Sequence, residues 1–148
     1  MSLADLCSRS PVTIAADASL VAAAQSMRAR HVGLLVVTPD GGAGPPIGVL
    51  TDRDIVIEVV SEGVDPTSVT VADAMTRQPL IVEFGATPEQ VLAQMRAFGV
   101  RRAPVVDPSG DLVGLIALDD LLEWLAGAIG SAAAVVRHEQ RVERQLRA

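Results

Sequence analysis

The phrase GVLTDRD, residues 48–54, places a hydroxyl and a carboxylate three positions apart. The carboxylate of Asp54 only accepts hydrogen bonds and can take two vicinal hydroxyl groups at once. The phrase lies where an apolar strand gives way to a helix, whose first N–H groups and dipole favour an anion. Thr51 and Asp52 are also common helix-start residues, and for Asp52 capping is the favoured interpretation. Asp54 lies past the cap position with no evident structural duty, which leaves its carboxylate as a candidate for chemistry beyond capping.

A second version of the phrase, GLIALDD at residues 114–120, keeps the glycine and the final aspartate but has Ala117 in place of the threonine. It belongs to a longer repeat, because a shift of 68 positions places Met27 on Met95 and keeps the order of the surrounding elements. The apolar runs and turn signals of each copy predict strand, helix, strand, strand and helix. These elements are expected at 11–17, 20–30, 32–37, 47–51 and 53–63 in the first copy, and at 80–84, 87–99, 102–107, 112–117 and 118–127 in the second.

The repeat predicts an α/β (α+β) fold in which two copies pack sheet to sheet with pseudo-twofold symmetry. A copy of about 60 residues with an exposed sheet face is too small to be stable alone. The expected divisions are 5–62 for the first copy, 63–72 for a linker, 73–127 for the second copy and 128–148 for a helical tail. The tail carries only a thin apolar stripe. It is either a frayed end or a contact with a dimer partner or an effector protein.

The composition narrows the classes of function. A net charge of -6 argues against nonspecific binding to DNA or RNA. The single cysteine, Cys7, cannot form an internal disulfide, and no residues stand at metal-ligand spacing. No signal peptide is present, and no apolar run reaches the roughly 20 residues needed to span a bilayer. A cytoplasmic protein without a nucleic-acid or membrane partner is expected.

The doubled pattern, with MTRQP at residues 75–79 and GVLTDRD, resembles a tandem CBS-domain pair, or Bateman module, of the kind found in small stand-alone bacterial CBS-domain proteins. The resemblance implies that the cleft between the copies binds an adenine nucleotide such as AMP, ADP or ATP, or a related adenosyl compound. It also implies that Thr51 faces phosphate and that Asp54 accepts from both ribose hydroxyls. Gly48 would let the backbone approach the ligand closely.

The missing hydroxyl of the second phrase then predicts two unequal sites. Ala117 cannot donate to phosphate, whereas Asp120 can still hold a ribose. A hydrogen bond to a charged group contributes about 1.5–3 kcal/mol. The second site is therefore expected to be weaker by roughly ten- to a hundredfold.

Phosphate also needs positive charge, and an adenine ring needs an apolar slot. The candidates for charge are Arg53, Arg101, Arg102 and Arg30, with His31 ranked below them. Arg101 and Arg102 point into the cleft or form a solvated surface pair, and Arg53 could equally face water. The expected walls of the first site, which could instead be ordinary core, are Thr13, Ile14, Val32 and Leu34.

The chain is interpreted as a regulatory module and not as an enzyme, because no nucleophile–base pair, Walker loop or metal-ligand cluster is found. No cofactor is expected. A ligand between the copies would favour one relative arrangement and so signal to an unknown effector protein. A homodimer is expected, with apolar surface from residues 54–60 and 121–129. The alternative is a structural or adaptor dimer that binds no physiological nucleotide and acts through protein–protein contacts.

Overall fold

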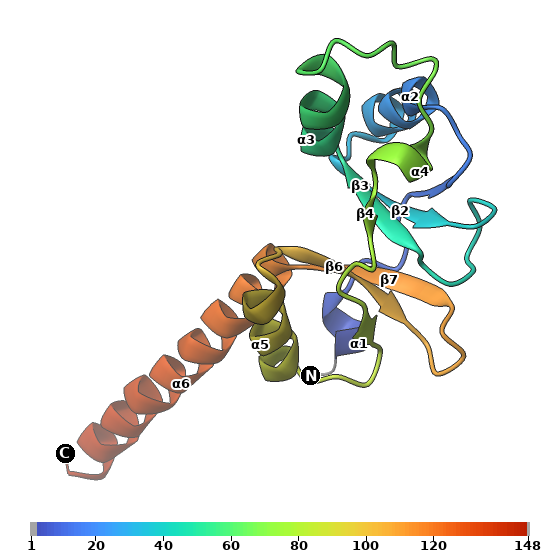
Figure 1. The fold of residues 1–148 in the computed structure, drawn as a ribbon. Helices are drawn as coiled ribbons and strands as arrows, with labels where there is room; N and C mark the ends of the chain where they lie inside the picture. Colours follow the sequence, from blue (N-terminus) through green and yellow to red (C-terminus); the bar gives the residue numbers. More distant parts are fainter. Residues whose placement is uncertain (1–2, 148) are drawn as a thin grey trace.

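The computed structural model describes residues 3–147 and contains two β-sheets that face each other, with helices on their outer sides (Figure 1). The first sheet has the order β1-β2-β3-β4, with β1 parallel to β2 and the other pairs antiparallel. The second has the order β5-β6-β7, with β5 parallel to β6 and β7 antiparallel to it. The strands are β1 (Thr13–Ala15), β2 (Leu34–Thr38), β3 (Gly48–Thr51), β4 (Thr76–Arg77), β5 (Val82–Glu83), β6 (Arg102–Val106) and β7 (Leu112–Ala117).

α2 and α5 begin at the capping residues that the sequence predicts. The side chain of Ser19 accepts from the N–H of Ala22 at 3.1 Å, and Thr87 forms a capping box with Gln90. The helices are α1 (Leu3–Leu6), α2 (Leu20–Arg30), α3 (Asp52–Ile55), α4 (Val71–Ala74), α5 (Pro88–Phe98) and α6 (Leu118–Leu146), with a π-helical segment at Val56–Val60.

The leading segment of each copy packs into the core of the other copy. Leu3 and Cys7 are buried in the second core, and Ser8 forms an antiparallel bridge with Leu115 of β7. In the same way α4 is buried in the first core, and β4 pairs with β3. The chain therefore crosses from one half to the other before β1 and again before β5.

The two sheets meet through a small apolar cluster of Leu34, Val36 and Leu112, with Val49 and Leu115 packed against it. All five positions of β2 are buried, as expected for a strand that is covered on both faces. The predicted fold class, two repeats packed sheet to sheet, is confirmed.

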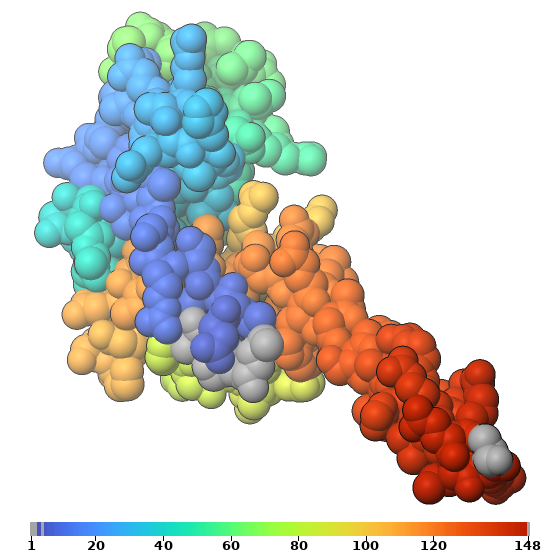
Figure 2. Space-filling model, turned by 180° about the vertical axis from the view of Figure 1, so that it is seen from behind, coloured from blue at the N-terminus to red at the C-terminus, as the bar shows by residue number. Residues whose placement is uncertain are grey.

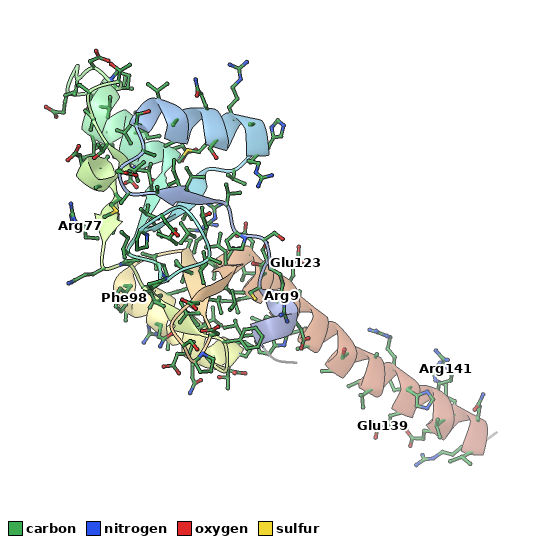
Figure 3. All side chains as sticks on the ribbon, turned by 90° about the vertical axis from the view of Figure 1, so that its right-hand side faces the viewer. Arg9, Arg77, Phe98, Glu123, Glu139 and Arg141 are labelled. Atoms are coloured by element: carbon green, nitrogen blue, oxygen red, sulfur yellow. The ribbon has the colours of Figure 1, made fainter. Side chains whose placement is uncertain are left out.

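The helices that follow the two phrases differ in length. α3 passes into the π-helical segment, and the chain then turns at Gly63, whose φ is 65°. α6 runs for 29 residues without interruption, so the division expected at residue 127 marks no break in the helix. Figures 1 and 2 show its C-terminal part standing clear of the body, with Glu139 and Arg141 projecting from it (Figure 3). Within residues 3–147, no helix combines the length and the apolar character needed to cross a bilayer.

Candidate functional site

The first phrase forms a capping box. The N–H of Asp54 donates to Thr51 Oγ1 at 3.1 Å, and the N–H of Thr51 donates to Asp54 Oδ2 at 2.8 Å. Asp54 therefore has a structural duty, and the expectation that it has none is wrong. The expectation that Asp52 caps the helix is also wrong, because Thr51 is the N-cap and Asp52 is the first helical residue. Oδ1 of Asp54 and the hydroxyl proton of Thr51 take no part in the box, so the box is compatible with a ligand.

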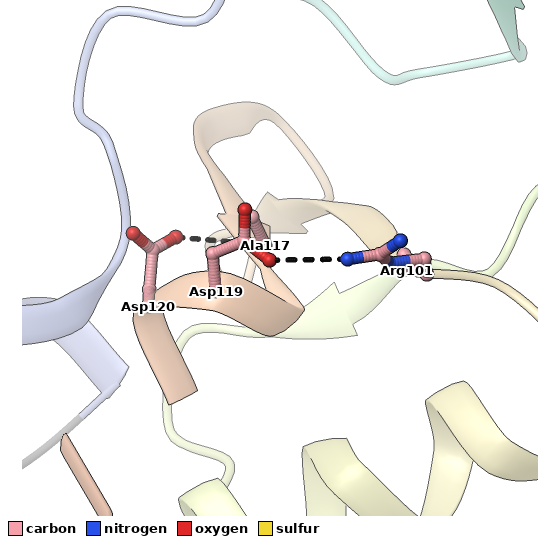
Figure 4. A network of polar contacts seen from close by, with 4 residues as sticks. All are labelled: Arg101, Ala117, Asp119 and Asp120. Carbon is pink, nitrogen blue, oxygen red and sulfur yellow. Dashed lines mark hydrogen bonds and ion pairs between the residues drawn. The ribbon is translucent and has the colours of Figure 1, made fainter. Parts of the chain in front are cut away.

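The second phrase keeps half of this arrangement. Asp120 Oδ2 accepts from the N–H of Ala117 at 2.9 Å (Figure 4). Ala117 has no side-chain acceptor for the return bond. The loss of the hydroxyl therefore removes a helix cap as well as a possible ligand contact.

The glycines of the two phrases leave space for another segment of the chain to pack against them. A Cβ on Gly48 would lie 2.5 Å from the sulfur of Met75 and 2.9 Å from the carbonyl oxygen of Thr76. A Cβ on Gly114 would lie 2.8 Å from the carbonyl oxygen of Ser8. Each phrase therefore needs glycine because the leading segment of the other copy lies against it. This corrects the interpretation of Gly48 as a point of close approach for the ligand.

A pocket of about 250 Å³ lies between the two copies. Most of its lining comes from the first copy, and two residues come from the second. The lining residues are Ser8, Ser10, Pro11, Val12, His31, Val32, Gly33, Leu34, Arg102 and Leu115. Val32, Leu34 and Arg102 are thus the predicted site residues that the pocket brings together.

The pocket borders the second phrase, through Leu115, and not the first. Thr51, Asp54 and Gly48 are absent from its lining, as are Arg53 and Asp120. Asp120 lies nearby, in the first turn of the helix that follows β7. The expected grouping of Val32 and Leu34 with Thr51 and Asp54 does not account for this pocket, because the crossed leading segment carries Ser8 and Ser10 to the second copy's strand.

Arg101 and Arg102 have different surroundings. Arg102 lines the pocket and lies opposite Ala117 in the pairing of β6 with β7. Arg101 forms an ion pair with Asp119 at 3.3 Å, with 75% of the Arg101 side chain exposed (Figure 4). Arg101 therefore fits the solvated alternative, while Arg102 is at the cleft.

Two of the residues expected to line the first site instead make contacts within the first copy. The hydroxyl of Thr13 donates to the carbonyl of Gly41, and Ile14 is buried in the first core. Ser8, Ser10, Pro11 and Val12 were not predicted as lining residues. A signal for them was present, because the similarity between the copies begins at Asp5 and Asp73, ahead of the first strand of each copy.

The interior beside the pocket is apolar enough to affect a titratable group. Burial raises the pKa of the Cys7 thiol above its ordinary value, with the nearby Arg9 acting in the opposite direction. Arg9 also lies over the ring of Phe84, 5.1 Å from its centre. These contacts fix the segment that leads into the pocket wall.

Known proteins show to which family the chain belongs and where each of its repeats begins. The family model of the CBS domain matches residues 3–61 and 71–127. The chain belongs to the CBS-domain family. Both matched ranges start at the leading helices, α1 and α4, which places these helices inside the CBS repeats. The tandem CBS pair inferred from the internal repeat is confirmed.

Similar proteins are found in several organisms. Hypoxic response protein 1 of Mycobacterium tuberculosis is 35% identical over 107 residues, which cover 72% of this chain and 73% of that protein. An uncharacterised protein of Methanopyrus kandleri is 32% identical over 83% of this chain, which spans 62% of that relative. A CBS-domain protein of Pyrobaculum aerophilum, solved in complex with AMP, has a TM-score of 0.74 and 25% identity, with coverage of 86% of this chain and 99% of that one.

Proposed function

We propose that this CBS pair is a regulatory module that binds an adenine nucleotide or an adenosyl-type ligand in the pocket between its two copies. The observation that carries the proposal is the pocket itself, which combines apolar walls with one arginine, one histidine and two serines. Small-ligand sites are usually built in this way, as apolar clefts with a few convergent polar groups. Its volume of about 250 Å³ is just below the usual range of about 300–1,000 Å³. The pocket therefore suits the nucleoside part, with the phosphates at the mouth.

The residues at the pocket suggest how such a ligand is held. Val12, Val32 and Leu34 offer an apolar slot for the base. Arg102 offers a fixed positive charge for phosphate, which can accept two parallel hydrogen bonds from a guanidinium. Asp120 uses one carboxylate oxygen for the helix cap, and the other is available to a ribose hydroxyl.

The pocket supports this proposal for the second phrase more directly than for the first. The ligand roles of Thr51 and Asp54 stay a prediction, for a separate site on the other side of the cleft. Because Arg102 faces Ala117, the second phrase has a phosphate-directed group of its own. We therefore expect it to bind more strongly than the missing hydroxyl alone predicts.

Binding would act on the arrangement of the two copies. The pocket wall at Ser8–Val12 is anchored at one end by Leu3 and Cys7 in the second core, and at the other it enters β1 of the first sheet. A ligand that contacts this wall and Arg102 touches both halves at once. It can shift their relative arrangement only by its difference in affinity for the two states.

A homodimer and an effector protein belong to the same proposal. Val56, Ile57 and Val60 on the first copy expose 55%, 44% and 68% of their surface, and Leu122 and Ile129 on α6 expose 52% and 63%. These residues fall in or next to the segments expected to form the dimer interface. Exposed apolar surface of this extent also fits the adaptor alternative, in which the dimer acts through protein contacts alone.

Calorimetric titration with AMP, ADP, ATP, NAD and S-adenosylmethionine tests the proposal. At least one of these compounds should bind, and Arg102→Ala should weaken a phosphate-bearing ligand at least tenfold, since a charge-assisted hydrogen bond is lost. Arg101→Ala is the matched control. Arg101 is next to Arg102 in the sequence, but its side chain pairs with Asp119 outside the pocket. No binding by any compound would favour the adaptor alternative.

A further inference from the structure

α2 and α5, the equivalent helices of the two CBS repeats, end in the same turn, built with different residues. α2 ends at His31, with φ 55° and ψ 43°, and α5 ends at Gly99, with φ 67° and ψ 32°. In both turns the next N–H, of Val32 or Val100, donates to a methionine carbonyl at 3.1 Å. The backbone is therefore left-handed at both positions, and the first copy has a histidine where the second has glycine.

A left-handed backbone is strained for any residue that carries a Cβ, and glycine is the usual residue at such a helix end. Burial of the His31 side chain does not offset this strain, because the residue is exposed. A favourable charge at the end of the helix does not require it either, since Arg28 and Arg30 already lie in the last turn of α2. Histidine adopts this backbone more often than most residues, but glycine would end the helix with less strain. A strained residue at a cleft points to a function.

His31 is one of the residues that line the proposed ligand pocket. With Ser8, Ser10 and Arg102 it forms the polar part of the lining, while Val12, Val32 and Leu34 are apolar. An imidazole N–H donates a hydrogen bond, and Arg102 contributes donors to the same lining. Two groups of this kind at one mouth favour an anionic group on the ligand.

We propose that His31 is a ligand-binding residue, which contacts the phosphate of a mononucleotide together with Arg102 and which the fold accepts at the expense of backbone strain. The inference deepens the proposed function and rests on it. It assigns opposite effects to one side chain, because His31 weakens the fold and strengthens ligand binding. A purely structural histidine would not have both effects.

The test compares His31→Gly with the reverse exchange in the other copy, Gly99→His. His31→Gly should raise the thermal midpoint by about 2–4 °C, because the strain is relieved. It should also lower the affinity for the bound nucleotide roughly tenfold, because one hydrogen bond to a charged group is lost. Gly99→His should lower the midpoint by a similar amount and leave the affinity unchanged.

The titrations use AMP, ADP and ATP with the full chain. If the wild type binds a nucleotide and His31→Gly binds it equally well, the inference is wrong and the proposed function stands. A midpoint lowered by His31→Gly also overturns the inference, because the residue then stabilises the turn. If the wild type binds none of the three, the inference is wrong, whereas the proposed function is still decided by the titrations with NAD and S-adenosylmethionine.

Discussion

Arg102 lies directly opposite Ala117 in the pairing of β6 with β7, just as Leu34 lies opposite Thr51 in the pairing of β2 with β3. Each phrase therefore has one polar group at this cross-strand pair. In the first copy it is a hydroxyl on the phrase, and in the second it is a guanidinium on the neighbouring strand. The two halves differ in which strand carries the group that can face an anion.

Restoring the hydroxyl should strengthen the second phrase. In Ala117→Thr, the new side chain can cap α6 through the N–H of Asp120 and lies beside Arg102. We expect a fold that is more stable by about 0.5–2 kcal/mol and a nucleotide affinity raised about tenfold. Urea unfolding and calorimetry measure the two effects. Thr51→Ala in the first copy should lower stability by a similar amount, and an unchanged stability in both variants would contradict the capping argument.

The phrase glycines should not tolerate a side chain. Gly48→Ala and Gly114→Ala each place a Cβ under 3.0 Å from a backbone oxygen of the other copy's leading segment. Overpacking of this kind typically costs about 1–3 kcal/mol. Gly85→Ala is the control, since a Cβ there has nothing within 4 Å. Denaturant midpoints should fall for the first two variants and stay near the wild-type value for the third.

The exchange of leading helices can be tested through Leu3 and Cys7. Leu3 is fully buried in the second core, so Leu3→Ala should destabilise the protein by about 2–5 kcal/mol. Cys7 is 7% exposed and its thiol pKa is raised, so the native protein should react slowly with iodoacetamide. Leu3→Ala should speed this reaction by freeing α1, whereas Leu146→Ala, at a residue that is 82% exposed, should not. Equal labelling rates in all three proteins would show that α1 does not protect the thiol.

Acid should weaken the start of α4. The N–H and hydroxyl of Thr70 donate to the carboxylate of Asp73 and lower its pKa below 3.8. A lowered pKa gives a contribution to stability that is complete above 3.8 and is lost as the pH falls through the folded-state value. Asp73→Asn should therefore be less stable than the wild type at pH 7, and the difference should shrink in acid. Unfolding curves that keep a constant separation down to pH 3 would exclude this linkage.

The order of the five main elements in each copy followed from the sequence because its signals are local, whereas α1, α4 and β4 were not expected. Ser19 and Thr87 stand immediately before helices with regular apolar spacing, and both are caps in the structure. The capping role of Asp54 also had a local signal, since threonine followed three residues later by an acidic residue is a known helix start. The last helix runs through Gly127 and Gly130, past the division expected at residue 127. The strong helix formers after them outweigh the cost of two glycines.

The pocket was harder to predict because it depends on contacts between distant parts of the chain. Arg102, Val32 and Leu34 were recognised as candidates from their types and their places at strand starts. Their partners could not be assigned, because the crossing of the leading segments decides which phrase each wall meets. The spacing of a repeat reveals that two copies exist. It does not reveal against which copy each leading segment packs.

α6 joins this cleft to a distant point in space. It starts beside the strand that lines the pocket, and its 29 residues extend about 43 Å at about 1.5 Å each. A tilt of about 10° at its first turn would swing the far end by about 7 Å, given that length. Among residues 3–147, the first phrase is followed by no such rod, since the helical segment after it ends by Val60. A small adjustment beside Arg102 and Asp120 that tilted α6 in this way would therefore be magnified at Leu146.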